Sequence, residues 1–547
     1  MMSTNLPRLP LGEASFSRLR QNGHLYVDKT ALLQKLIEEG RAFFLARPRR
    51  FGKSLTISTL YEMLTGNDKL FCGLDAEPWV KAQSSKPWPV LWLDFSSFDS
   101  NGSAQDLTNW VNRKLLAFAE HYAISTAAEA SCAETLDTIL ELVSKQKGAV
   151  AVLIDEYDAP LLDNLNDLEK LQSFRKLLRQ FYKVLKACSP CICFSLITGI
   201  SLFVKNGIFS AANNLIDISS EVEYGAITGY TQKELEDYFH AYIDDAVRKN
   251  IMPTTASLLE KLKKYYNGFS FDGQTKVYNP FSLLSFFRKY QFSNYWYSSG
   301  SVTFIENYFK NHKIASPDSY HLLKVDEESL APREIEAANP ESFLYQAGYL
   351  TLVQRTEKYL ILDYPNQEVL NSLSKMYLSS IYPIPDYVEV GQRLWQAVEH
   401  ADFAALAKIF NAALASLPYH DFGFWQKGEN REPNESFYRA LFLMLLRGCG
   451  VQAHGEMPTC RGRSDVLIES PKQVLLMEFK LAKSAQDIAA KRKEGEKQIL
   501  DSGYLEPYLS GSIPVSSTVF VVDARKRQIV FTTTHGGSLD SDTRSQG

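Results

Sequence analysis

The chain has 547 residues, more than one compact core usually holds, so its length predicts two or three domains of about 100 to 200 residues each. Hydrophobic residues make up 45% and charged residues 22%, which excludes a chain that is disordered throughout. The formal net charge of -4 gives no general attraction to nucleic acid, so binding of that kind would need a local basic surface.

The cysteines and the start of the chain bear on its cellular compartment. Seven cysteines without a paired framework predict a reduced chain, and therefore a cytoplasmic one. Residues 1–11 lack a basic stretch followed by an apolar run, and nowhere do 18 apolar residues follow one another. We therefore expect neither secretion nor a membrane partner.

Residues 24–230 alternate short apolar runs with helical stretches. Runs that are apolar on both faces and separated by long connections are typical of a parallel α/β sheet. The four predicted strands are Ala42–Ala46, Val90–Phe95, Val150–Ile154 and Cys193–Ile197.

A phosphate-binding loop is predicted directly after the first strand. Such a loop needs backbone N–H groups that converge on the anion, a glycine without a Cβ, a lysine for the outer phosphates and a hydroxyl for magnesium. Gly52, Lys53 and Ser54 supply the last three, and residues 55–64 read as the helix that should follow. Arg47 stands where the usual pattern has its first glycine, a departure that weakens the motif on its own.

Side chains at the ends of two later strands support a nucleotide site. Asp155 and Glu156 follow six apolar residues; one carboxylate can hold a magnesium-bound water and the next can orient the attacking water. Thr198 ends a further strand and could sense the γ-phosphate, although a strand-end cap is an equal alternative. The predicted ATP-binding residues are Arg49, Arg50, Phe51, Gly52, Lys53, Ser54, Asp155 and Thr198, with Ser54 and Asp155 also on Mg²⁺. The two arginines could instead simply solvate the loop.

The middle of the chain is predicted to be helical and rich in aromatic residues. Thr231 and Glu234 form a capping box, in which the hydroxyl and the carboxylate satisfy reciprocal backbone donors at the start of a helix. The tyrosines and phenylalanines that follow are more typical of a core than of base-stacking platforms. Further along, Leu344–Val353 and Tyr359–Leu362 are predicted to be a strand pair, and Gln392–Leu417 a strongly helical stretch.

A hairpin near the C-terminus carries a cluster of charged side chains. Residues 461–468 and 474–481 are predicted to pair as its two strands. Glu478 and Lys480 are two residues apart on the second strand and so point to one face, while Asp465 comes from the first strand. Phosphodiester cleavage needs carboxylates to hold a divalent metal and a lysine to position or help deprotonate the attacking water, and these residues have that chemistry.

Two more residues could complete this cluster, and a basic surface could bind its substrate. Glu435, at the start of a predicted helix, could add a carboxylate near the metal, and Gln498, on a later helix, could brace the site. Between residues 461 and 500 nine basic residues face six acids, which could offset phosphate repulsion, although a solvated face carries such charges equally well. The basic residues are Arg461, Arg463, Lys472, Lys480, Lys483, Lys491, Arg492, Lys493 and Lys497.

These motifs resemble those of a known family, the AAA-ATPase-like proteins of bacteria and archaea that carry a C-terminal PD-(D/E)xK nuclease-like domain. The resemblance covers nearly the whole chain and includes Tyr26–Thr30, Arg47–Ser54, Ile154–Pro160, Gln346–Thr351, Glu435, Asp465, Glu478–Lys480 and Gln498. An arginine-rich loop without the first glycine is usual in that family. Ser464 stands where the name of the superfamily places proline, a variation that leaves the predicted metal ligands intact.

The residues and the resemblance together imply an α/β protein in three parts. They are a P-loop ATPase parallel sheet, a helical or winged-helix-like extension, and a C-terminal α/β restriction-endonuclease-like domain. The expected divisions are an ATPase-like domain in 1–250, a middle region in 251–384, a nuclease-like domain in 385–534 and a disordered tail in 535–547.

The leading functional hypothesis is a protein that binds and hydrolyses ATP with Mg²⁺ and controls a metal-dependent nuclease domain acting on DNA, with RNA and homo-oligomerisation left open. Asp465 and Glu478 would hold the second metal. One rival is an ATP-dependent switch or scaffold whose C-terminal domain binds nucleic acid or a partner without cleavage; another binds nucleotide without hydrolysing it. The predicted catalytic residues are Glu156, Glu435, Asp465, Glu478, Lys480 and Gln498.

Overall fold

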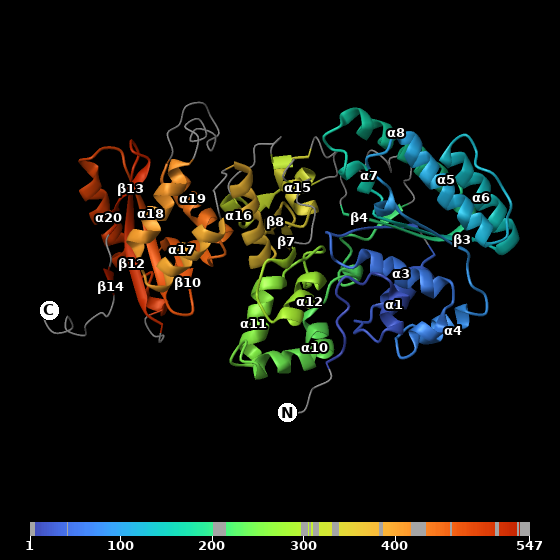
Figure 1. Ribbon diagram of the computed structural model, residues 1–547, viewed down its shortest axis with the longest axis horizontal. Helices are drawn as coiled ribbons and strands as arrows, with labels where there is room; N and C mark the ends of the chain where they lie inside the picture. Colours follow the sequence, from blue (N-terminus) through green and yellow to red (C-terminus); the bar gives the residue numbers. More distant parts are fainter. Residues whose placement is uncertain are drawn as a thin grey trace. The chain divides into compact units, whose positions relative to one another are not determined.

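The chain forms two compact units, each described here by itself (Figure 1). The N-terminal unit comprises Met1–Tyr308 and Leu322–Val369, and the C-terminal unit comprises Phe309–His321 and Leu370–Gly547. The divisions expected at 250 and 384 stay predictions. The computed structural model describes residues 6–40, 42–200, 215–296, 305, 308–309, 317–330, 338–381, 387–416, 434–459, 462–508, 513–532 and 535–536.

A five-stranded parallel sheet forms the centre of the N-terminal unit, which confirms the predicted α/β class. The strand order is β2-β3-β4-β1-β5, so β1, which leads into the phosphate loop, lies beside β4. All four predicted strands are present, with ends that differ by no more than two residues. Their bounds are β1 Ala42–Ala46, β2 Val90–Asp94, β3 Val150–Asp155, β4 Ile192–Gly199 and β5 Leu215–Asp217.

Helices cover both faces of this sheet (Figure 1). On one face lie α1 (Phe16–Gln21), α3 (Lys53–Leu64) and α4 (Glu77–Gln83). On the other lie α5 (Ala104–His121), α6 (Cys132–Lys147) and α8 (Leu168–Ala187). Strands buried on both faces explain why their sequences read as continuous apolar runs.

The helical extension begins where the capping box predicts. Thr231 caps α10 (Gln232–Arg248), and Glu234 returns the bond to the backbone N–H of Thr231. The aromatic residues that follow are core residues, as expected: α10, α11 (Thr255–Tyr266) and α12 (Pro280–Lys289) enclose a cluster that includes Tyr266, Tyr278 and Phe286.

One predicted strand is wrong in its first half. Asn339 caps the N-terminus of α15 (Pro340–Gln346), so residues 344–346 belong to a helix. The chain then turns at Gly348, whose φ is +85°. The strand begins only after this turn, as β7 (Thr351–Arg355). It pairs with β8 (Leu360–Asp363), which is the second strand of the predicted pair. With β6 (Leu323–Val325) they make a small antiparallel sheet in the order β6-β8-β7.

The stretch predicted to be helical over 392–417 is two helices. They are α17 (Tyr387–Glu399) and α18 (Phe403–Ala415), which follow α16 (Gln367–Ile381) in the chain. Ala401 has a φ of +50°, and the Asp402 carboxylate then caps α18, so the chain restarts in a new direction. Apolar periodicity cannot show this break, because both helices keep an apolar face.

The C-terminal unit is built on a mixed sheet in the order β13-β12-β11-β10-β9, which confirms the predicted α/β domain. β10 and β11 form the predicted antiparallel hairpin, and β11 pairs in parallel with β12. α20 packs on β11 and β12, and α19 contacts β9, β10 and β11. The bounds are α19 Glu435–Gly448, β9 Ala453–Thr459, β10 Gly462–Glu469, β11 Val474–Ala482, α20 Asp487–Asp501, β12 Val515–Asp523 and β13 Gln528–Thr532.

The expected disordered tail and the expected lack of a membrane helix can be compared with the structure only over the described residues. His535–Gly536, the first residues of the expected tail, form β14 against β12, and residues 537–547 lie outside the described residues. Among the helices that are described, none combines the length and the apolar character needed to span a bilayer.

Candidate functional site

The phosphate loop joins β1 to α3 in the geometry that the motif requires. Gly52 has a φ of +90° and is the N-cap of α3, while Lys53 and Ser54 form the first turn of that helix. A glycine adopts this backbone conformation without the strain that a Cβ would add. The open N–H groups of a helix N-terminus attract anions, so the loop presents a phosphate site before any side chain contributes.

Lys53 is held under the loop by backbone carbonyls. Its side chain is 4% exposed, and its Nζ donates to the carbonyl oxygens of Arg47 at 3.0 Å and Pro48 at 3.1 Å. Burial lowers the pKa of this ammonium, and the nearby Glu156 and Asp155 offset that effect only in part. Among the described residues no carboxylate forms an ion pair with this ammonium, and a phosphate could provide that partner.

Arg47 explains how the loop forms without its first glycine. The side chain is 1% exposed and turns back into the unit, where its Nη1 donates to the Ser219 carbonyl at 2.7 Å and its Nη2 to the Tyr224 carbonyl at 3.2 Å. Its guanidinium also lies 4.1 Å from the centre of the Phe271 ring. Arg47 therefore anchors the loop and is not exposed as a phosphate ligand.

A cavity of about 540 Å³ opens over the phosphate loop, a size ordinary for a ligand site. The predicted residues Arg49, Arg50, Phe51, Gly52, Lys53, Ser54 and Glu156 all line it. The Phe51 ring is fully buried and packs edge-on against Phe269 at 4.7 Å, so Phe51 can offer its backbone to a ligand rather than its ring.

Other walls of this cavity come from segments that sequence reasoning missed. They are Pro10–Ala14, Ile227–Tyr230 and Phe281, which carry mainly apolar or small side chains. Tyr26, Val27 and Lys29 also contribute; they belong to a motif of the family resemblance, the only signal that could have pointed to them. Apolar walls suit a nucleoside, whose base needs surface contact more than charge.

The predicted acids divide between the cavity and the layer behind it. Asp155 is 1% exposed and accepts a hydrogen bond from the Thr198 hydroxyl, and neither residue is among those that line the cavity. Glu156 does line it, with a φ of +46°. Burial raises the pKa of the Glu156 carboxyl, with a smaller opposing effect from Lys53. The two alternatives for Thr198, a strand-end cap and a sensor of the γ-phosphate, stay predictions.

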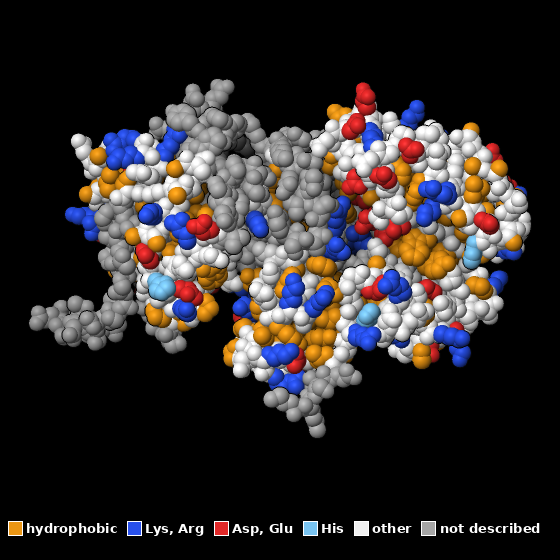
Figure 2. Space-filling view, viewed as in Figure 1, with side chains coloured by type: hydrophobic (Ala, Val, Ile, Leu, Met, Phe, Trp, Pro, Cys, Tyr) orange, Lys and Arg blue, Asp and Glu red, His pale blue; other side chains and the backbone are white. Residues whose placement is uncertain are grey.

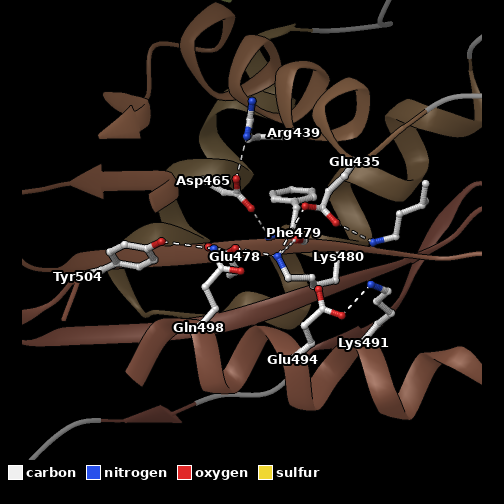
Figure 3. A network of polar contacts seen from close by, with 11 residues as sticks. Glu435, Arg439, Asp465, Glu478, Phe479, Lys480, Lys491, Glu494, Gln498 and Tyr504 are labelled. Atoms are coloured by element: carbon white, nitrogen blue, oxygen red, sulfur yellow. Dashed lines mark hydrogen bonds and ion pairs between the residues drawn. The ribbon is translucent and has the colours of Figure 1, made fainter. Parts of the chain in front are cut away.

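The C-terminal charged residues converge at the end of the hairpin (Figure 3). Glu478 is 1% and Lys480 4% exposed, and the Lys480 Nζ lies 2.8 Å from the Glu478 Oε1. Glu435, on the first turn of α19, places its Oε1 3.6 Å from the same Nζ and accepts a bond from the Leu481 N–H. Two acids thus share one buried lysine.

Asp465 has a different cation as its partner. Its Oδ1 lies 2.8 Å from the Nη1 of Arg439, and its Oδ2 accepts a hydrogen bond of 2.8 Å from the Phe479 N–H. Sequence reasoning missed Arg439. The available signal was its spacing, since it follows Glu435 by four residues and lies on the same face of α19.

The pKa values of this cluster are shifted because several acids lie close together in a buried site. Burial, and then the charge of Asp465, raise the pKa of Glu478 to about 7, although Lys480 opposes them. Burial also raises the pKa of Glu435. Burial alone would lower the pKa of Lys480, but Glu478 and Glu435 more than offset it, so that pKa is raised.

The donors at this site fit a divalent metal bound by few side chains. The Glu478 Oε2 is buried and has no hydrogen-bond partner among the described residues, so it could accept a cation. The described residues contain no group of three His, Cys, Asp or Glu side chains that could enclose a metal. Mg²⁺ commonly uses one or two carboxylates and takes its remaining ligands from water and substrate phosphate.

Gln498 reaches from α20 to the side of Glu478 (Figure 3). Its Nε2 donates to the Tyr504 hydroxyl at 3.3 Å. One turn earlier, Gly495 allows α20 to approach closely: a Cβ there would lie 2.6 Å from Val519 and 3.4 Å from the Cγ of Lys480. The helix therefore packs directly over the lysine, and the bracing role of Gln498 stays a prediction.

Fewer of the nine basic residues are available at the surface than the sequence suggests. Lys480 is buried, Arg461 lies outside the described residues, and ion pairs occupy Lys472, Lys491 and Arg492. In Figure 2 some basic side chains gather at the upper edge of the C-terminal unit, and others lower on that face lie beside acidic ones. The exposed members are Arg463, Lys472, Lys483, Lys493 and Lys497.

Comparisons with solved structures show only weak likeness. ORC1 of Aeropyrum pernix, in complex with DNA, is 10% identical with a TM-score of 0.26, over 80% of this chain and 88% of that one. ORC2 of Aeropyrum pernix is 8% identical with a TM-score of 0.27, over 64% and 92% of the two chains. TM-scores this low carry no argument about this protein.

Comparisons of sequence are decisive for the family. A model described as a predicted AAA-ATPase matches residues 10–209, and a model of the PD-(D/E)XK nuclease superfamily matches residues 433–532. An uncharacterized protein of Azotobacter chroococcum mcd 1, from the vnfD 5′ region, is 32% identical over 515 residues, which cover 93% of this chain and 95% of that protein. The chain therefore belongs to the family of predicted AAA-ATPases that carry a C-terminal domain of the PD-(D/E)XK nuclease superfamily.

Proposed function

We propose that this protein binds and hydrolyses ATP at its phosphate loop and uses the nucleotide to control metal-dependent cleavage of DNA by its C-terminal domain. The observation that carries the proposal is the placement of Glu478. This buried carboxylate has Lys480 on one oxygen, no described hydrogen-bond partner on the other, and Asp465 near enough to raise its pKa. Such a group is poised to accept a cation beside a lysine.

In the N-terminal unit, Lys53 would exchange the carbonyls of Arg47 and Pro48 for phosphate oxygens, with little movement of the loop. Ser54 would hold Mg²⁺, which would neutralise phosphate charge, and Asp155, behind the wall of the cavity, would support that metal through a bound water. Glu156, at the wall of the cavity, would orient the attacking water. Arg49 and Arg50 would add charge at the phosphate end.

In the C-terminal unit, Asp465 and Glu478 would hold Mg²⁺, which would neutralise charge on the scissile phosphate. Lys480, which its carboxylate partners keep protonated, would position the attacking water and stabilise the hydroxide that forms when the proton of that water leaves to solvent. Glu435 accepts the Leu481 N–H and faces Lys480, so its role would be to keep that ammonium in place. Lys483, Lys493 and Lys497 would offset the repulsion of the DNA backbone.

One observation favours a second function, a switch or scaffold that binds nucleic acid without cutting it. Arg439 and Lys480 already contact the acids that would hold a metal. Acids neutralised in this way could serve only to keep the fold together. The two functions differ in a measurable property, because only the nuclease breaks phosphodiester bonds and needs a divalent cation in the C-terminal domain to do so.

The test of the nuclease function is a cleavage matrix of plasmid DNA with Mg²⁺ or Mn²⁺, each with ATP, with ADP and without nucleotide. Wild-type protein should cut only with metal, and Glu478→Ala and Lys480→Ala should each abolish cutting. Glu469→Gln, which changes an acid at the far end of β10, should cut normally. Absence of cutting in every lane, with DNA retained on the protein, would replace the nuclease with the scaffold. Structured and single-stranded RNA in the same matrix decide between DNA and RNA.

The test of the ATPase is phosphate release by the full chain. Lys53→Ala should abolish release, whereas Lys81→Ala, an exposed lysine of α4, should leave it unchanged. Release that survives Lys53→Ala would contradict the assignment, and nucleotide binding without release would leave a nucleotide-gated binder. Cytoplasmic location and homo-oligomerisation stay predictions, to be checked by cell fractionation and light scattering.

A further inference from the structure

Arg439 is the one charged residue of the C-terminal cluster that neither motif nor resemblance points to. It lies in the second turn of α19, whose start is set by the Asn434 side chain accepting from the Phe437 N–H. Its Nη1 lies 2.8 Å from the Asp465 Oδ1, and the two side chains are 17% and 10% exposed. A charged pair this buried interacts far more strongly than one at the surface.

The two cations of the cluster serve different acids. Lys480 contacts Glu478 at 2.8 Å and Glu435 at 3.6 Å, whereas Arg439 contacts Asp465. The other oxygen of Asp465 is occupied by the Phe479 N–H. Asp465 therefore owes its charge balance to Arg439 and its orientation to both contacts.

A guanidinium cannot leave this contact by losing its proton, since arginine stays charged at any physiological pH. A metal that uses Asp465 must either displace Arg439 or share the carboxylate with it. A carboxylate has about four lone-pair positions, so sharing is geometrically allowed. If the metal and Arg439 share Asp465, the repulsion between the two cations weakens the binding of the metal. If the metal displaces Arg439, breaking the ion pair of Arg439 with Asp465 weakens that binding instead.

From this contact we propose that Arg439 is a positioning residue that competes with the divalent cation for Asp465. It stabilises the acid when no metal is present and sets the metal affinity of the site below what the carboxylates alone would give. This inference rests on the proposed function in one respect, that Asp465 is a metal ligand. It adds that the metal-free site is neutralised by the protein itself.

The test is Mn²⁺ binding to the full chain without nucleotide, followed by electron paramagnetic resonance, with thermal unfolding in parallel. Arg439→Met should tighten Mn²⁺ binding at the Asp465-dependent site by about tenfold, the effect of removing one charge at contact distance. It should also lower the metal-free unfolding temperature and enlarge the rise that Mn²⁺ produces. Arg439→Lys, which keeps the charge, should bind within about twofold of wild type.

Three further variants make the result specific. Asp465→Asn should remove the site and so identify it. Arg447→Met changes another buried arginine of α19, one that donates to the Ala453 carbonyl, and should not tighten binding. Arg439→Gln keeps a hydrogen-bond donor without the charge and replaces the Met variant if that one fails to fold.

Each outcome bears on the inference separately from the function. Asp465-dependent binding that is unchanged or weaker in Arg439→Met and Arg439→Gln would overturn the competition while the nuclease stands. Binding by these variants but not by wild type would support the competition and count against the nuclease. If neither wild type nor any variant binds Mn²⁺ through Asp465, the competition by Arg439 and the proposed nuclease function are both wrong.

Discussion

Lys53 and Lys480 are two lysines buried to the same extent in two different units, and their charges are treated in opposite ways. Each residue is 4% exposed. Lys53 donates to two neutral carbonyls, and its pKa is lowered by burial. Lys480 contacts two carboxylates, and its pKa is raised despite burial.

The difference indicates which ligand each site awaits. A lysine held by neutral carbonyls can exchange them for an anion without leaving a charge behind, which suits phosphate. A lysine held by carboxylates favours their ionised form and keeps them in place, which suits a site that must receive a cation. Burial alone therefore does not define a phosphate-binding lysine, because the partners of the ammonium decide its role.

The largest expected effect that could break this comparison is on stability. Lys480→Met removes the cation from the buried Glu478 and should cost the C-terminal unit about 3–5 kcal/mol. Lys53→Met also removes a buried charge, but it leaves only carbonyls behind, and should cost the N-terminal unit less, about 1–3 kcal/mol. Urea unfolding of each variant without ligands measures both. Equal losses would contradict the comparison, and adding Glu478→Gln to Lys480→Met should recover most of the loss.

The next effect concerns a buried acid in the N-terminal unit. The Glu368 Oε1 accepts the Trp296 N–H at 2.8 Å, and burial raises the pKa of this carboxyl from 4.5 to about 8. Because the folded pKa lies above the unfolded value, its stabilising contribution is full below about pH 4.5 and is lost as pH rises through 8.

Glu368→Gln removes this titration and keeps an acceptor for Trp296. Wild type should therefore lose about 2–3 kcal/mol relative to the variant between about pH 6 and pH 9. Unfolding temperatures of both proteins across that range provide the measurement. Parallel curves would mean that Glu368 does not titrate there and that its backbone contacts hold it ionised, as carboxylate partners hold Lys480.

A smaller effect tests whether the carbonyls around Lys53 must stay in place. Gly348 has a φ of +85°, and a Cβ there would lie 2.5 Å from the Cγ of Pro48, whose carbonyl accepts from Lys53. Gly348→Ala should therefore displace the loop and weaken ATP binding about tenfold, or roughly 1.4 kcal/mol. A fluorescent nucleotide titration measures this.

The control is Gly73→Ala, at a φ of +77° with open space around it. It carries a similar backbone strain, so it should lower the unfolding temperature and leave ATP affinity unchanged. Equal weakening by both variants would show that strain, not contact with the loop, is responsible.

The smallest effect concerns one hydrogen bond behind the loop. The Trp296 Nε1 donates to the Arg49 carbonyl at 3.2 Å. Trp296→Phe keeps an aromatic ring and removes this bond, so ATP binding should weaken about threefold to fivefold, near the 1 kcal/mol that one such bond contributes. Trp92→Phe, on the exposed face of β2, should have no effect. Unchanged affinity in Trp296→Phe would show that the loop carbonyls need no outside support.

Much of the scaffold could be predicted because it depends on local patterns. The apolar runs of β1 to β4, the capping box at Thr231 and the hairpin that carries Asp465 and Glu478 all lie within short stretches of sequence. The failures occurred where local patterns were ambiguous. Residues 344–346 belong to a helix that Asn339 caps, and one residue in the left-handed region, Ala401, divides an otherwise continuous helical pattern.

The sequence by itself determined the family, the two kinds of chemistry and the residues Lys53 and Lys480 that should carry them. Only the tertiary structure decided how each charge is balanced. The Arg47 side chain, at the position of the usual first glycine, lies in the core and donates to the Ser219 carbonyl. Thr198 donates to Asp155 behind the cavity, and Arg439 forms an ion pair with Asp465. The physical reason is that charge balance depends on distances between segments far apart in the chain, whereas strands, caps and motifs depend on residues that are neighbours in the sequence.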